Sequence, residues 1–154
     1  MVKRKATDQV LGVEFLGVED AEPAAGVLEA ISDSQRVIVC PSNPVVSIGT
    51  ILSVKGIREA LKKTRAVKVG VSPIIGGKPV KGPADRLLRG LGHEVSAFSV
   101  AKLYSDFLDV FIIDSADAAE KAFIEQLGLK VEVTNTLMRS LEDKIQLAKI
   151  ALEA

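Results

Sequence analysis

The sequence lacks tryptophan, contains one tyrosine and one cysteine, and has no excess charge of either sign. With aromatic residues at 4%, it offers few side chains on which the bases of single-stranded nucleic acid could stack. Its 20 basic and 20 acidic residues cancel, so no overall charge attracts nucleic acid or an anionic membrane. A single cysteine cannot form an intramolecular disulfide. We therefore expect a protein that binds no nucleic acid and folds without disulfides.

Long hydrophobic runs are also missing. No stretch approaches the roughly 18 consecutive apolar residues that identify a transmembrane helix. The first residues, MVKRKATDQ, are basic like the start of a signal peptide, but no apolar segment follows at the usual distance. We therefore expect a cytoplasmic protein that does not contact a membrane.

The common catalytic patterns are absent as well. There is no Walker A motif and no GxGxxG motif, so the sequence lacks the usual motifs of nucleoside triphosphatases and of dinucleotide-binding proteins. His93 is the only histidine, follows a helix-ending glycine and is expected at the surface, while Cys40 is expected to be buried in a strand. A hydrolytic triad and a Cys/His metal site are therefore not expected, and the catalytic residues stay unknown.

Hydrophobic residues make up 47% of the chain, enough for one packed domain over residues 1–154. Apolar strands alternate with amphipathic helices, which predicts an α/β fold of Rossmann-like, three-layer type: a mostly parallel sheet with helices on both faces. The last helix is expected to bury a stripe of Leu137, Leu141, Ile145, Ala148 and Leu152. Strands are predicted at 9–17, 36–40, 66–72, 108–114 and 129–135, and helices from Pro23 and at 56–64, 84–92, 99–107 and 116–128.

The first candidate site is the loop after the strand that ends at Cys40. Parallel sheets bind ligands beyond the carboxyl ends of their strands, where such loops lie. Prolines restrict this loop, and a glycine lets backbone amides approach an anion. A simple turn would explain the same residues. The candidate contacts are Ser42, Asn43, Pro44, Ser47 and Gly49.

The second candidate site is the loop 72–83, SPIIGGKPVKGP, after the strand at 66–72. Gly76 and Gly77 could expose amides, and Lys78 and Lys81 could place ammonium groups on phosphate oxygens. Residues 51–105 hold eleven basic and three acidic residues, which is compatible with an anionic ligand or with ordinary solvated helix faces. Asp85 follows at the start of a helix, where it either caps the helix or reaches a ligand.

Two further carboxylates follow the strand at 108–114. Asp114 and Asp117 lie in the sequence IIDSAD and could form a cation or ribose site. Such residues more often cap the following helix. Both interpretations stay open from the sequence.

Three blocks of the sequence resemble one family, in its order and spacing. They are CPSNPVVSIGTILSVKGIREAL at 40–61, VSPIIGGKPVKGPADRLLRGLG at 71–92, and EVSAFSVAKLYSDFLDVFIID at 94–114. Together they look like the carboxyl-terminal half of 2-phospho-L-lactate transferase, the CofD family of coenzyme F-420 biosynthesis. The resemblance runs from about Val10 to the end of the chain.

This resemblance implies a transferase of phosphorus-containing groups. The reaction would move a 2-phospholactyl or phosphoenolpyruvyl group from a GDP-activated donor, lactyl-2-diphospho-5′-guanosine, to the deazaflavin Fo, releasing GMP and requiring Mg²⁺. Positioning and charge neutralisation supply most of the rate of such a displacement at phosphorus. The first loop would line the donor side, with the glycine–lysine loop nearby.

The resemblance also implies that part of the enzyme is missing. Members of the family are about twice as long, and their amino-terminal half holds the metal-binding aspartates and most contacts to Fo. We therefore expect this chain to supply part of the site, to be inactive alone, and to form a homo-oligomer or pair with a chain that supplies the other half. A fragment, a truncated product and a split enzyme stay open. The alternative functions are a non-catalytic nucleotide or nucleotide-sugar binding module, similar to the gluconeogenesis-factor family, and a purely structural half.

Overall fold

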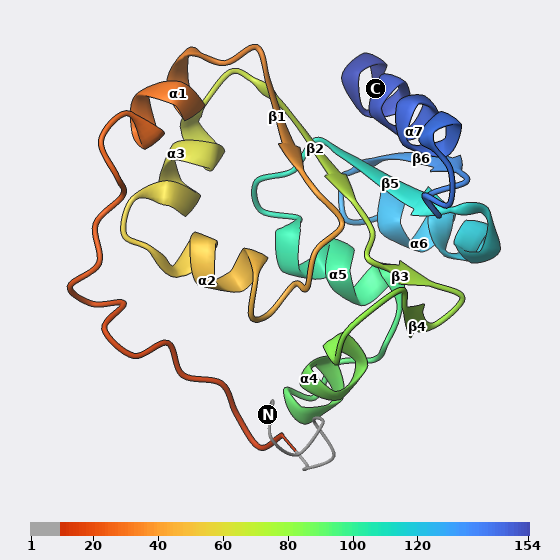
Figure 1. The fold of residues 1–154 in the computed structure, drawn as a ribbon, viewed down its shortest axis with the longest axis horizontal. Helices are drawn as coiled ribbons and strands as arrows, with labels where there is room; N and C mark the ends of the chain where they lie inside the picture. The colour runs from red at the N-terminus through yellow and green to blue at the C-terminus, as the bar shows by residue number, and fades with distance from the viewer. Residues whose placement is uncertain (1–9) are drawn as a thin grey trace.

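The centre of the fold is a four-stranded parallel sheet (Figure 1). The computed structural model describes residues 10–154 of the protein. The strands lie in the order β1-β2-β5-β6, which is also their order along the chain. They are β1 (Arg36–Val39), β2 (Val67–Val71), β5 (Val110–Asp114) and β6 (Lys130–Thr134). The predicted α/β fold with a mostly parallel sheet is thereby confirmed.

The strands form where the sequence is rich in branched apolar residues. All five residues of β5, VFIID, are buried, and Phe111, Ile112 and Ile113 have no exposed surface. A parallel sheet covered on both faces requires such a continuous apolar run, because successive side chains enter opposite layers. β5 pairs with β2 on one side and with β6 on the other, which makes it a central strand.

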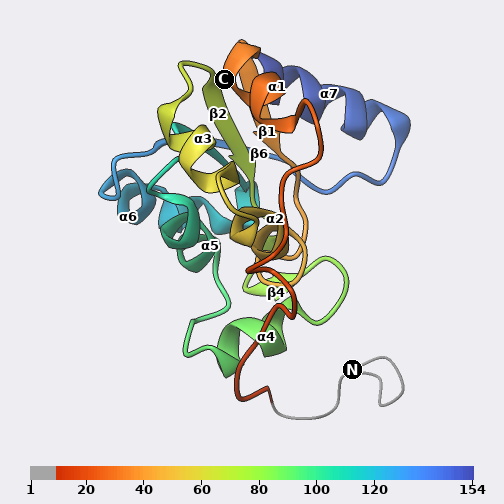
Figure 2. The ribbon, with the colours of Figure 1, turned by 90° about the vertical axis from the view of Figure 1, so that its left-hand side faces the viewer.

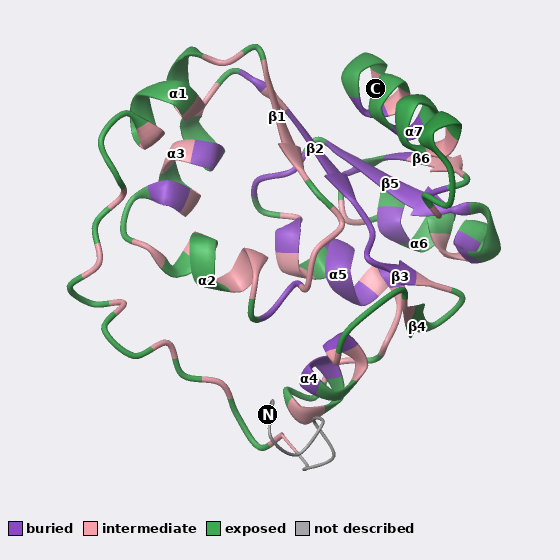
Figure 3. Ribbon diagram, in the orientation of Figure 1, coloured by how far each residue is buried: buried purple, intermediate pink, exposed green. Residues whose placement is uncertain are grey.

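Helices cover both faces of this sheet (Figure 2). On one face, α3 (Ile57–Lys63), α5 (Ala97–Tyr104) and α6 (Lys121–Glu125) pack against Phe111 and its neighbours. On the other face, α7 (Leu141–Glu153) packs alone against β2 and β5. The buried residues therefore form two clusters separated by the sheet, and they coincide with the purple segments of Figure 3.

The remaining elements connect these layers. The helices α2 (Ile48–Ser53) and α4 (Ala84–Gly90) and the 3-10 helix η1 (Ser115–Glu120) come after strands, whereas α1 (Val27–Asp33) leads into the amino end of β1. The loop after β2, predicted to be irregular, contains a small antiparallel hairpin of β3 (Ile74–Ile75) and β4 (Lys78–Pro79). No helix within residues 10–154 is long and apolar enough to cross a membrane.

The strand predicted at 9–17 is absent over the described residues 10–17. This segment runs without strand pairing from α4 past α2 (Figure 2). Val13 and Phe15 are half-buried, whereas Leu11 and Leu16 are 84% and 87% exposed. The side chains alternate as in a strand only over residues 13–16, and a strand also needs a neighbour for its backbone hydrogen bonds. The described part of the chain provides none, so the prediction was wrong; residue 9 lies outside the described residues.

The predicted stripe on the last helix was wrong as well. α7 packs on the sheet through Leu147 and Ala151. Leu141, Ile145 and Leu152 of the stripe are instead 65%, 43% and 58% exposed. The helix is apolar on two sides, and the side with Leu147 and Ala151 faces the sheet. Periodicity alone could not distinguish these two sides.

Other differences concern single residues and element ends. Cys40 is exposed just after β1, not buried within the strand. α1 begins at Val27 instead of near Pro23, after Gly26 adopts a left-handed conformation with φ 85°. The predicted helix 116–128 is divided into η1 and α6, with a non-helical backbone at Asp117.

Candidate functional site

A cavity of about 510 Å³ lies at the edge of the sheet where the parallel strands end. Both candidate loops contribute to its wall, together with the segment that follows β6. The loops come from neighbouring strands β1 and β2, whose carboxyl ends meet at one edge because the strands are parallel. The lining residues are Pro41, Ser42, Asn43, Val46, Ser47, Ser72, Pro73, Ile75, Val80, Lys81, Gly82, Pro83, Ala84, Thr136, Leu137 and Met138.

Asn43 shapes the first loop. Its side-chain Oδ1 accepts hydrogen bonds from the backbone amides of Val45 (2.9 Å) and Val46 (3.1 Å). Its backbone carbonyl accepts from the amides of Ser47 (3.2 Å) and Ile48 (3.0 Å), at the start of α2. Asparagine bonded in this way folds the chain into a tight turn. The predicted loop therefore passes into a helix at Ile48, and the Asn43 oxygen is engaged within the turn.

The two other polar residues predicted in this loop are better placed to contact a ligand. Ser42 and Ser47 both line the cavity. Ser47 occupies the residue before α2, and its side chain makes no capping hydrogen bond there. Within residues 10–154, neither hydroxyl makes a side-chain hydrogen bond, unlike the Asn43 oxygen.

The glycine–lysine loop is divided between the cavity and the hairpin. Lys81 lines the cavity, whereas Lys78 lies in β4 and is exposed. Gly76 and Gly77 form the two-residue hairpin turn, with φ 57° and 72°. A two-residue turn of this kind needs positive φ at both positions, which glycine adopts most easily. These two glycines therefore have a structural reason to be present.

The hairpin turn binds a carboxylate of the same chain. The Gly76 amide donates to both oxygens of Asp117, at 2.9 and 3.1 Å. Burial raises the pKa of Asp117, while the hydrogen bonds from Gly76 and Gly77 oppose that shift. The amide of Gly76, predicted to be available to a ligand anion, is therefore already occupied by an internal one.

Asp114 occupies the helix-capping position that the sequence left open. One oxygen accepts from the Ala116 amide at 3.0 Å, and the other from the amide and hydroxyl of Thr136, at 2.8 and 3.1 Å. Burial opposes ionisation of Asp114, but these hydrogen bonds outweigh it and hold the pKa below its usual value. Asp114 therefore ties the end of β5 to the segment after β6, beside the cavity.

The described residues contain no ready-made cluster of ligands for the magnesium ion that the resemblance implies. No group of three or more His, Cys, Asp or Glu side chains is arranged to hold a metal within residues 10–154. The lining of the 510 Å³ cavity includes no carboxylate. Magnesium binds through one or more carboxylates in most protein sites.

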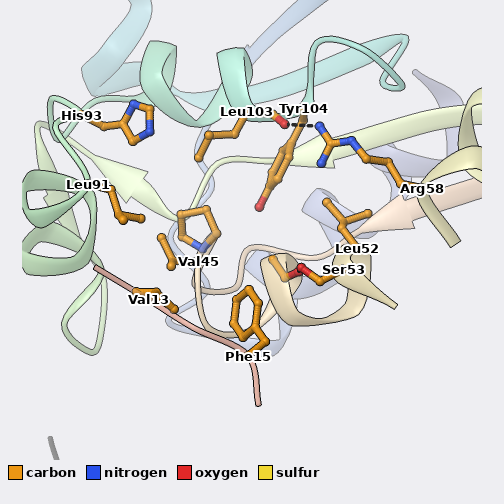
Figure 4. Close-up of a pocket in the computed structure, with 12 residues that line it drawn as sticks. Val13, Phe15, Val45, Leu52, Ser53, Arg58, Leu91, His93, Leu103 and Tyr104 are labelled. Carbon is orange, nitrogen blue, oxygen red and sulfur yellow. Dashed lines mark hydrogen bonds between the residues drawn. The ribbon is translucent and has the colours of Figure 1, made fainter. Parts of the chain in front are cut away.

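A second, smaller cavity of about 250 Å³ lies on the other side of the first loop (Figure 4). Pro44 and Gly49, both predicted to contact a ligand, line this cavity and not the larger one. His93 also lines it and is half-buried, in contrast to its predicted surface position. Of the ten predicted residues, Ser42, Asn43, Ser47 and Lys81 share the larger cavity, while Gly76, Gly77, Lys78 and Asp85 line neither.

Asp85 lies in the first turn of α4 and is half-buried. The residue before this helix is Pro83, and no side chain caps the helix.

The prediction from the sequence did not include four residues of the cavity wall: Ser72, Thr136, Leu137 and Met138. Two of them could have been found from their position, because Ser72 is the last residue of the strand predicted at 66–72 and Thr136 directly follows the strand predicted at 129–135. The prediction considered only the two loops with unusual proline, glycine or lysine content and the carboxylates Asp114 and Asp117 after the strand at 108–114.

The fold places the chain in the class of three-layer α/β proteins, which bind ligands beyond the carboxyl ends of their parallel strands. A protein of the UPF0052 family from Bacillus halodurans has a similar fold, with a TM-score of 0.60 and 18% sequence identity. The match covers 88% of this chain and 49% of that protein. At this level of identity the similarity concerns the fold alone.

Residues 1–147 match the family described as 2-phospho-L-lactate transferase CofD, and the chain belongs to this family. A 2-phospho-L-lactate transferase of Methanosarcina mazei is 43% identical over 99% of this chain and 50% of its own length. A phosphoenolpyruvate transferase of Kitasatospora aureofaciens is 46% identical over 89% of this chain and 43% of its own length. The chain thus spans about half the length of the curated relatives it matches.

Proposed function

We propose that this chain binds the guanine-nucleotide end of an activated donor in the larger cavity, as part of the active site of a 2-phospho-L-lactate transferase. The reaction would transfer a 2-phospholactyl or phosphoenolpyruvyl group from the GDP-activated donor to the deazaflavin Fo and release GMP. The observation that supports this proposal is the meeting of both candidate loops in one cavity of 510 Å³. Relatives with transferase names match nearly the whole chain.

The residues of the cavity suit a phosphorylated ligand. Lys81 can place its ammonium group on a phosphate oxygen, and no carboxylate of the lining competes for it. Ser42 and Ser47 can donate hydroxyl hydrogen bonds from the opposite loop. Asn43 would act indirectly by holding the turn that positions both serines. The chain would thus bind and orient the donor, which is the main task in catalysis of phosphoryl transfer.

The proposal also concerns what this chain does not supply. Within residues 10–154, no group of three or more His, Cys, Asp or Glu side chains is arranged to hold a metal. We therefore expect the metal ligands and most contacts to Fo to come from other residues of a complete enzyme. Purified chain mixed with donor, Fo and Mg²⁺ should release no GMP, and sustained turnover by this chain alone would contradict this part of the proposal.

Calorimetric titration with GDP tests the proposed binding site. Lys81→Ala should weaken GDP binding by about tenfold or more, because a hydrogen bond to a charged group contributes about 1.5–3 kcal/mol. Lys78→Ala is a matched control, since it removes the same charge from the same glycine–lysine loop (72–83) but lies outside the cavity. It should change the affinity by less than about twofold, given the small effect of exposed charges.

The GDP affinities of the two lysine variants distinguish a defined contact in the cavity from a general effect of charge. Unchanged GDP affinity in Lys81→Ala would exclude the cavity as the nucleotide site. Equal losses in both lysine variants would indicate attraction by the charge of the loop in general, without a defined contact. ADP in place of GDP tests base recognition, and equal affinity for the two nucleotides would contradict the guanine-specific part of the proposal.

A further inference from the structure

An apolar stripe on α7 is left uncovered within residues 10–154. Leu141, Ile145 and Leu152 are 65%, 43% and 58% exposed, and Ala148 between the last two is exposed as well. The spacing of four, three and four residues is that of the buried positions along the seam of a coiled coil. Contiguous exposed apolar residues with polar residues around them mark an interaction surface. The stripe therefore has the pattern of a surface that receives another helix.

The stripe faces away from the sheet. Leu147 and Ala151 attach α7 to the sheet. Because an α-helix turns by about 100° per residue, Ile145 lies about 200° around the helix axis from Leu147. Figures 1 and 2 both show α7 at the margin of the fold. A partner of this stripe therefore approaches from the solvent side, and the described chain does not have to rearrange to admit it.

Two copies of the stripe fit each other when the two helices run antiparallel. Leu141 then lies opposite Leu152 of the second copy, and Ile145 lies opposite Ala148 of the second copy. In the central layers a large side chain thus meets a small one, which lets the helices pack closely. This arrangement has a twofold axis, and each copy contributes the same surface. The stripe is therefore complementary to itself.

The charges beside the stripe favour the antiparallel orientation. Glu142 and Lys149 are exposed and lie on the same flank of the stripe, whereas Lys144 is exposed on the other flank. In the antiparallel pair, Glu142 of each copy lies near Lys149 of the other, which gives two pairs of opposite charge. A parallel pair would instead place Lys149 near Lys144 of the other copy, twice. The antiparallel pair brings like charges together only once, where the two Lys144 side chains meet on the exposed flank. Charge complementarity thus selects a second copy in the antiparallel orientation.

We propose that α7 forms the interface of a symmetric antiparallel homodimer, with Leu141, Ile145, Ala148 and Leu152 of both copies at its centre. A helix of 13 residues is about 20 Å long, so the contact lies at the small end of specific interfaces. The dimer is therefore weak, with a Kd in the range of roughly 10 µM to 1 mM. None of these four residues lines the larger cavity, so the inference does not depend on the proposed donor site.

Sedimentation equilibrium of the purified chain over this concentration range tests the interface. Ile145→Gln removes one apolar side chain from each copy and keeps a residue that favours helix. It should raise the Kd by about tenfold or more, because each dimer loses two buried apolar side chains. Phe123→Gln is the matched control, since Phe123 is 59% exposed on α6, outside the stripe. It should change the Kd by less than about twofold.

A reversal of charge tests the orientation of the two helices. Lys149→Glu would place two carboxylates near each other in both opposite-charge pairs, and should raise the Kd by about 2- to 10-fold at low salt. The double variant Glu142→Lys, Lys149→Glu exchanges the two charges and should return the Kd to within about twofold of its original value. In a parallel dimer, Lys149→Glu would instead remove the repulsion from Lys144 and lower the Kd.

Three results would overturn the inference. A chain that stays monomeric at the highest concentration would leave a different protein, such as the other half of a complete enzyme, as the occupant of the stripe. A dimer with the same Kd in Ile145→Gln would use another surface. A lower Kd in Lys149→Glu would show that the helices are not antiparallel. Circular dichroism of each variant confirms that the fold is retained, so that none of these results is confused with unfolding.

Discussion

Raising the pH above neutrality provides a direct test of the environment of Tyr104. Burial of the hydroxyl raises the pKa of Tyr104 well above its usual value of 10, and the positive charge of Arg58 offsets only part of this shift. The folded protein should therefore keep this phenol protonated at a pH where an exposed tyrosine has ionised. With one tyrosine and no tryptophan in the chain, the near-ultraviolet absorbance of the phenolate reports this single group.

The same shift predicts a loss of stability at high pH. In the unfolded chain, Tyr104 loses its proton near pH 10, whereas in the folded protein it keeps it. Above that pH the unfolded state binds fewer protons than the folded state, so the free energy of unfolding falls as the pH rises. The loss is about 1.4 kcal/mol for each pH unit above 10, until the pKa of the folded state is reached.

Urea unfolding at a series of alkaline pH values measures this loss. Lysines titrate in the same range, so Tyr104→Phe serves as the control, and the difference between the two stability curves isolates the tyrosine. We expect the two curves to run parallel below about pH 9.5 and to diverge above it, with the wild-type protein falling faster. Phenolate absorbance with a midpoint near pH 10, while circular dichroism is still native, would refute the reasoning.

Two predictions concern stability at other positions. Gly70→Ala should destabilise the protein by about 1–3 kcal/mol, because the added Cβ would lie 2.6 Å from Leu108 Cδ1 and 3.1 Å from Phe111 Cδ2. Gly12→Ala, with no atom within 4 Å, is the control, and equal urea midpoints for the two variants would contradict the packing argument. Ser140→Ala should lower the free energy of unfolding by about 1 kcal/mol, since Ser140 Oγ accepts from the Asp143 amide at 3.1 Å in the capping box of α7. An unchanged urea midpoint would show that the cap does not stabilise this helix.

The sheet could be predicted from the sequence because its strands are short apolar runs between clear turn signals. Each of its four strands falls within a predicted range, and the parallel arrangement follows from the helices between them. The segment 10–17 has an equally good pattern but no neighbour in the described residues. Strand formation depends on pairing as well as on composition, and pairing is not visible in a local window of sequence.

The site could be predicted as a region but not residue by residue. The rule that ligands bind at the carboxyl ends of parallel strands selected both loops of the larger cavity. It could not show that the Gly76 amide is bonded to Asp117, which lies 41 residues further along the chain. Nor could it show that the first loop has two sides, with Ser42 facing one cavity and Pro44 the other.

The strand order has a consequence for how the sheet is made. Because β1, β2, β5 and β6 are neighbours in the order of synthesis, each strand that leaves the ribosome can pair with the one completed just before it. The sheet then widens at one edge only, and no strand has to enter between two that are already paired. Within the described residues, the outer edge of β1 stays open throughout this growth. A further strand could therefore join there at any stage, before or after the rest of the chain is complete.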